Sequence, residues 1–126
     1  MLFSALETTG TLLTSKETFK MPEDELVLMN KDQAKEDLKW DLLEVLNTTL
    51  DSDIMQEFLD TNENYLQEIL AYRQLYWWYV ANDVGEGSRN RELMRIYDKK
   101  YREMIRKLYN MRAYEIPRTR TLTISR

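Results

Sequence analysis

The chain has 126 residues, the length of one ordinary domain, and 32% of them are charged. It contains no cysteine and no histidine, which excludes disulfides, thiolate metal sites and the commonest general base and metal ligand. The net charge of −4 hides a split: residues 1–85 hold 6 Lys/Arg and 17 Asp/Glu, whereas residues 86–126 hold 12 and 5. Halves of opposite sign either fold against each other or suit association with an unlike charged surface, such as a second copy, another protein or nucleic acid.

The first residues are rich in Thr and Ser and show no helical stripe. We interpret residues 1–21 as an N-terminal arm, in which residues 11–14 are a candidate strand edge. The first ten residues contain Glu7 and no basic residue, so they do not resemble a signal peptide. Pro22 is suited to open a helix, and the acidic residues 23–25 then lie near its positive end. Residues 26–29 continue it as a short helix or form an apolar turn.

Few glycines and prolines, with many helix-forming residues, predict helices over most of residues 22–113. One helix is expected at residues 31–47, capped by Asn30 or Asp32. A short helix at residues 54–60 follows the cap Asp51-Ser52-Asp53.

The densest apolar run is YLQEILAYRQLYWWYV at residues 65–80. Its apolar residues recur at i, i+3 and i+4, and from Leu75 to Val80 every residue is apolar or aromatic. Such a helix is buried on several sides, by its own chain or by neighbouring copies. The run is too short to span a membrane and is interrupted by Arg73. The polar side chains Gln67, Glu68, Arg73 and Gln74 are expected on its other side.

The last helix, predicted at residues 89–113, carries two apolar series spaced by seven. They comprise Met94, Tyr97, Tyr101, Met104, Leu108 and Met111. This seam predicts antiparallel packing against residues 65–80, with a turn at residues 85–88 in which Gly85 or Gly87 takes positive φ and Ser88 caps the helix. We expect these residues in the core or at a subunit interface: Tyr72, Tyr76, Trp77, Trp78, Tyr97 and Tyr101.

No motif predicts catalysis or a bound cofactor or metal. Residues 60–64 begin like a calcium loop, but Tyr65 and Ala71 replace the required Gly and Glu. Gly85 and Gly87 lack the third glycine and the preceding strand of a phosphate loop. We therefore expect a protein that is not an enzyme.

Basic residues wind around the last helix: Arg89, Arg91, Arg95, Lys99, Lys100, Arg102, Arg106, Lys107 and Arg112. This pattern suits a solvated or protein-facing surface, and alternatively a phosphate-binding surface for nucleic acid. After Pro117, basic or apolar residues alternate with Thr and Ser, which is a strand period. Residues 114–126 are therefore interpreted as an extended basic tail that docks on another surface.

Several segments from Asp53 to Met111 are similar to the small head-tail adaptor, or head completion, proteins of tailed bacteriophages. They are the acidic DIMQEFLDTNENY, the Ala-Tyr-x-x-Leu-Tyr run at residues 71–76, the turn DVGEGS and Tyr-Asp-Lys-Lys-Tyr-Arg-Glu at residues 97–103, with the basic tail after them. The resemblance implies a structural virion protein of the neck region, cytoplasmic before assembly, that repeats as a ring beneath the portal with its inner surface toward the DNA channel. It also implies that Arg118, Arg120, Leu122, Ile124 and Arg126 contact the portal. The Thr-rich first 20 residues depart from the pattern.

The sequence thus predicts an all-α, small helical bundle with extended arms, which forms a homo-oligomer, contacts portal and tail proteins and does not enter a membrane. Non-specific contact with DNA is compatible with this interpretation. Two alternatives stay open: a nucleic-acid-binding helical protein that uses the basic last helix, and a small regulator that binds one partner protein.

Overall fold

The structure is a computed structural model, and it describes residues 1–17, 19, 21–83, 85 and 88–115. These residues form helices and no strand, which confirms the predicted all-α bundle. The elements are η1 (Phe3–Ala5), α1 (Gly10–Thr14), α2 (Glu23–Leu26), α3 (Lys31–Leu46), α4 (Asp53–Thr61), α5 (Glu63–Ala81) and α6 (Arg89–Glu115).

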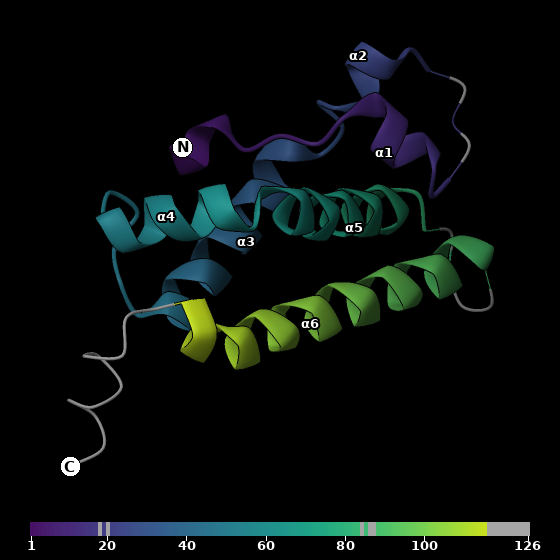
Figure 1. Ribbon diagram of the computed structural model, residues 1–126. Helices are drawn as coiled ribbons and strands as arrows, with labels where there is room; N and C mark the ends of the chain where they lie inside the picture. Colours follow the sequence, from purple (N-terminus) through teal and green to yellow (C-terminus); the bar gives the residue numbers. More distant parts are fainter. Residues whose placement is uncertain (18, 20, 84, 86–87, 116–126) are drawn as a thin grey trace.

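The two longest helices, α5 and α6, lie side by side and antiparallel, as the seam of the last helix predicts (Figure 1). The turn between them uses the expected residues. Gly85 has a φ of 126°, which favours glycine, and the Ser88 hydroxyl accepts a hydrogen bond from the Arg91 amide at 3.1 Å. The local chemistry of the turn therefore brings the two helices together.

Residues suited to capping also lie at the boundaries of α3 and at the start of α4. Ser52 begins α4 by accepting a hydrogen bond from the Met55 amide at 3.0 Å. Asn47 ends α3 in the left-handed conformation, with a φ of 51°. Asn30 occupies the N-cap position of α3, as predicted, but its side chain makes no capping hydrogen bond.

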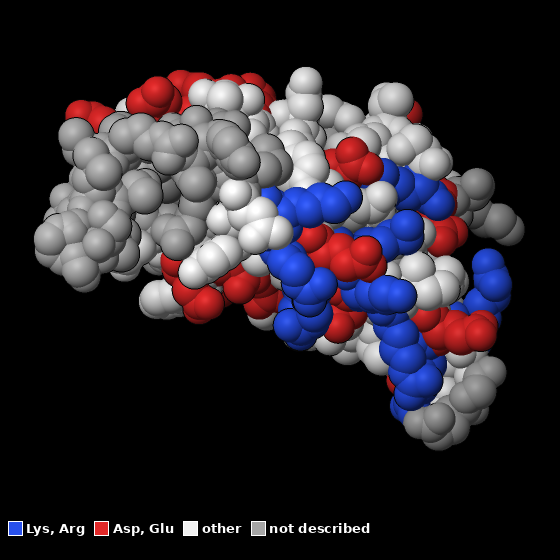
Figure 2. Space-filling view, turned by 60° about the horizontal axis from the view of Figure 1, so that its bottom comes forward, with Lys and Arg blue, Asp and Glu red and all other residues white. Residues whose placement is uncertain are grey.

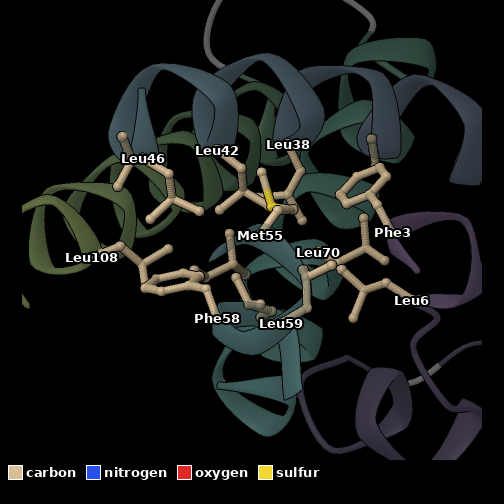
Figure 3. Packing of buried hydrophobic residues seen from close by; sticks show 14 of the residues in the cluster. Phe3, Leu6, Leu38, Leu42, Leu46, Met55, Phe58, Leu59, Leu70 and Leu108 are labelled. Atoms are coloured by element: carbon tan, nitrogen blue, oxygen red, sulfur yellow. The ribbon is translucent and has the colours of Figure 1, made fainter. Parts of the chain in front are cut away.

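The core consists of two clusters, and both include residues of α5 and α6. The main cluster joins η1, α3, α4, α5 and α6, and Figure 3 shows leucines of α3 facing those of α4 and α5. The second cluster lies where α1 and α2 meet α5 and the first half of α6; it contains Leu13, Leu26, Met29, Ala71, Leu75, Tyr79 and Tyr97. Tyr72 of α5 packs against both clusters and so connects them.

The predicted strand edge at residues 11–14 is wrong, because these residues form α1. The Thr9 hydroxyl caps this helix by accepting a hydrogen bond from the Leu12 amide at 3.1 Å. Leu6 and Leu13 are 1% and 0% exposed, so tertiary burial stabilises the helical conformation despite the β-propensity of the threonines. The N-terminal segment thus packs on the bundle through a few isolated apolar residues, and these are too widely spaced to give a helical periodicity in the sequence.

The last helix continues to Glu115, two residues beyond its predicted end and into the segment expected as tail. Residues 116–126 lie outside the described residues.

Candidate functional site

The six aromatic residues expected in the core or at an interface all pack within the chain. Tyr97 and Tyr101 are buried, and the other four, all in α5, are half-buried. Trp77 packs against the main cluster, and Tyr76 and Trp78 pack against the second. Two of the six residues are thus buried and four lie partly exposed against the core clusters, and a role between subunits stays a prediction.

The centre of the bundle holds a charged group that the sequence analysis placed on the polar side of α5. Arg73 Nε donates to Asp37 Oδ2 at 2.7 Å, and Nη1 donates to Asp98 Oδ1 at 2.9 Å. The two carboxylates belong to α3 and α6, so one guanidinium joins three helices. Burial alone would lower the pKa of Arg73, but its hydrogen bonds to Asp37 and Asp98 raise it above its usual value.

Aromatic rings surround this guanidinium. Its Cζ atom lies 4.2 Å from the ring centroid of Tyr76 and 4.5 Å from that of Tyr101. The Tyr101 hydroxyl donates to Asp41 of α3, and burial followed by this bond raises the pKa of Tyr101 well above its usual range. Each charge therefore has a partner inside the chain, which is the arrangement of a structural ion-pair network rather than of a reactive site.

Arg73 and its neighbour Gln74 are the polar residues that sequence reasoning misplaced. Gln74 is fully buried and donates to the carbonyls of Val27 and Met29 at 3.2 Å and 2.9 Å. A signal was present, because a helix predicted to be buried on several sides also buries the polar residues among its apolar ones. Their partners, distant in sequence, were not visible in any local pattern.

A cavity of about 290 Å³ lies between α3 and α6. Its acidic and basic residues come from different helices, with Asp41 and Glu44 on α3 and Arg102 and Arg106 on α6. Val45, Tyr101, Ile105 and Tyr109 complete the lining. The mixed charges and apolar residues give this cavity no preference for one class of ligand.

A second hollow of about 450 Å³, here called the α2–α5 groove, lies between α2 and the end of α5. It is lined by Met21, Glu25, Leu28, Met29, Asn30, Trp78, Ala81 and Asn82. Leu28 is 63% exposed, the largest exposure among the large apolar side chains described. The neighbouring acids Glu23, Asp24 and Glu25 are exposed and make no ion pair with any described residue. The groove is thus largely apolar, with one acidic lining residue, Glu25.

The surface of α6 that faces away from the bundle is basic but interrupted by acids. Figure 2 shows Lys and Arg side chains gathered over one face with Asp and Glu among them. Within the described part of the chain, Lys99, Arg106 and Lys107 make no ion pair. These cations remain available to an external anionic surface.

The residues expected to bind a partner through the tail, namely Arg118, Arg120, Leu122, Ile124 and Arg126, all lie outside the described residues. Among the described residues, no group of three or more acidic side chains is placed to hold a metal ion. None of the helices described here combines the length and the apolar character needed to cross a bilayer.

Comparison with known proteins returns no relative: no family model matches the sequence, and no curated protein or solved structure is significantly similar to it.

Proposed function

We propose that this chain is a structural virion protein, a head-tail adaptor subunit that assembles as a ring and docks on the portal through its C-terminal tail. In this proposal the folded bundle provides the subunit body, and its surfaces bind protein neighbours. The assignment to the phage neck rests on the resemblance in pattern, between Asp53 and Met111, to head-tail adaptor proteins.

The observation that carries the proposal is that, among the described residues, few ion pairs join the acidic first half of the chain to the basic second half. Of the ion pairs within the described residues, one joins a cation after residue 85 to an anion before it, namely Arg91 with Asp83 at 2.8 Å. The acids of α2 and the outer cations of α6 are therefore free to attract unlike surfaces on neighbouring subunits. Exposed apolar side chains such as Leu28 would be buried at such a contact, and their burial would add to the electrostatic attraction.

An affinity pull-down of the tagged chain from its native source tests this proposal. The extract is held at moderate salt and treated with nuclease, and retained proteins are identified by mass spectrometry. We expect large portal, capsid or tail proteins, and their recovery should fall when the tail carries Leu122→Ser and Ile124→Ser. Recovery of no assembly protein would contradict the adaptor function.

A second candidate is non-specific nucleic-acid binding by α6. It is favoured by Lys99, Arg106 and Lys107, which make no ion pair with any described residue. Fluorescence anisotropy with duplex DNA at low and moderate salt distinguishes it, because phosphate-driven affinity falls about 10³-fold or more over this range when six or more phosphates are contacted. The double variant Lys99→Gln, Arg106→Gln should then weaken binding and flatten the salt dependence. A protein-docking surface shows neither effect.

A further inference from the structure

We infer that the α2–α5 groove is the receptor for the C-terminal tail of a second copy of this chain, with Leu122 and Ile124 seated in the groove and the tail arginines beside the acids of α2. The inference rests on the proposed function, in which the tail is a docking element, and it concerns the homo-oligomer that is not bound to the portal, because Leu122 and Ile124 cannot occupy the groove and contact the portal at the same time.

The chemistry of the tail matches that of the groove. In an extended chain successive side chains alternate sides, so residues 118, 120, 122, 124 and 126 share one face. That face reads Arg, Arg, Leu, Ile, Arg, which is an apolar pair flanked by cations. The groove offers matching chemistry: Leu28, Met29 and Trp78 are apolar, and Glu25 lines the groove with Asp24 next to it in sequence. Neither acid makes an ion pair with any described residue.

The tail cannot place Leu122 in the groove of its own chain. Asn90 Nδ2 donates to the carbonyl of Asn82 at 2.7 Å, so α6 begins beside the groove. From Asn90 to Glu115 the helix then rises about 38 Å away from it. Figure 1 shows α2 at the top of the view and the end of α6 at the lower left, on the other side of α5.

Leu122 lies seven positions after Glu115, and an extended chain of that length covers at most about 25 Å. The groove that receives both apolar residues therefore belongs to another copy. A contact between the tail of one subunit and the groove of the next is heterologous, and it closes into a ring when the rotation between subunits is a whole fraction of a turn. This geometry is compatible with the ring that the adaptor proposal requires.

Disulfide trapping between two full-length variants tests the pairing directly. The chain has no cysteine, so the only thiols in a mixture of Leu28→Cys and Ile124→Cys are the introduced ones. We expect the mixed 28–124 disulfide to exceed either homodisulfide by about tenfold, since the bond requires close and oriented Cβ atoms. The matched control replaces Leu28→Cys by Ile96→Cys, an exposed apolar position on α6. Equal cross-linking of position 124 to positions 28 and 96 would overturn the inference.

A charge exchange provides a second, independent test by sedimentation velocity. The groove variant Asp24→Lys, Glu25→Lys and the tail variant Arg120→Glu, Arg126→Glu should each weaken self-association by about tenfold, and an equimolar mixture should restore it. The control Asp51→Lys, Glu57→Lys reverses two exposed acids outside the groove and should leave self-association unchanged. A mixture that stays as weak as its components, with normal helical circular dichroism in both, would contradict the pairing.

The two proposals fail separately. If position 124 cross-links to position 28 but the pull-down recovers no assembly protein, the chain self-associates through its tail and the adaptor function is wrong. If the pull-down recovers portal or tail proteins through Leu122 and Ile124 but no preferential 28–124 disulfide forms, the adaptor function holds and the second copy is not the receptor.

Discussion

Arg73 fixes the relative positions of three helices through two carboxylates. Its side chain is 11% exposed, and those of Asp37 and Asp98 are 22% and 29% exposed. We predict that Arg73→Met lowers the free energy of unfolding by about 3 kcal/mol, because it removes the buried guanidinium that pairs with two partly buried carboxylates. Urea denaturation followed by circular dichroism measures this change.

Arg102 provides the matched control for the charge itself. It also pairs with Asp98, at 3.0 Å, but its side chain is 67% exposed. We expect Arg102→Met to lower the free energy of unfolding by less than about 0.5 kcal/mol, as for other exposed pairs. Equal losses from the two variants would show that burial of the Arg73 guanidinium contributes nothing to the free energy of unfolding.

Asp83, in the turn between α5 and α6, makes the free energy of unfolding depend on pH. Hydrogen bonds from Arg91, the Gly85 amide and Ser88 lower its pKa to about 2. A carboxylate with a depressed folded-state pKa stabilises the fold above its unfolded pKa, and this contribution is lost as the pH falls through the folded value. We therefore predict that Asp83→Asn destabilises the chain at pH 7, and that its difference from the unmodified chain shrinks between about pH 4 and 2.

Urea denaturation at pH 7, 4 and 2.5 measures this difference, with Asp51→Asn as the control. Asp51 is exposed and makes no ion pair within the described residues. A difference for Asp83→Asn that stays constant across this range would contradict the assigned pKa.

At the scale of elements, α1 and α2 approach each other at Gly10. A Cβ atom added there would lie 2.4 Å from Glu23 Cβ, well inside van der Waals contact. Alanine in a helix is favoured over glycine by about 1 kcal/mol, yet we predict that Gly10→Ala destabilises the chain, by about 1–3 kcal/mol, because α2 must shift. Thr11→Ala, at an exposed position of the same helix, should be neutral or stabilising. Thermal denaturation of both variants decides which effect is larger.

The N-terminal segment should behave as part of the bundle. Leu6 is buried in the main cluster, whereas Leu2 is 55% exposed. We predict that Leu6→Ala lowers the free energy of unfolding by about 3 kcal/mol. Leu2→Ala should change it by less than about 0.5 kcal/mol. Similar small effects of both substitutions would show that residues 1–6 are a dispensable arm.

The elements that the sequence predicts well are those whose signals are local. The α5–α6 hairpin follows from a heptad seam and from Gly85 and Ser88 in the turn, and α4 follows from Ser52 as its cap. Elements that depend on distant partners were missed: α1 is helical because Leu13 is buried against other elements, and Arg73 is buried because Asp37 and Asp98 meet it. The α2–α5 groove was equally invisible, since residues about 50 positions apart form it.

At the scale of the whole molecule, the two core clusters raise the question of whether the chain unfolds as one unit. Helices α5 and α6 contribute to both clusters, and Tyr72 contacts both. Continuous helices that pass through two clusters couple them, because disruption of one frees the apolar face that the other needs. A chain of this size with such coupling is expected to unfold in a single cooperative transition.

The three tryptophans report on this coupling. Trp77 packs against the main cluster and Trp78 against the second, while Trp40 is 60% exposed. We predict that a variant retaining only Trp77 and one retaining only Trp78, with the others changed to Phe, each show coincident urea transitions by fluorescence and circular dichroism. Comparison within each variant removes the stability change that the substitutions cause. A fluorescence transition from Trp78 at lower urea than the helical signal would mean that α1 and α2 detach first, which would expose Trp78 and open the α2–α5 groove before the rest of the bundle unfolds.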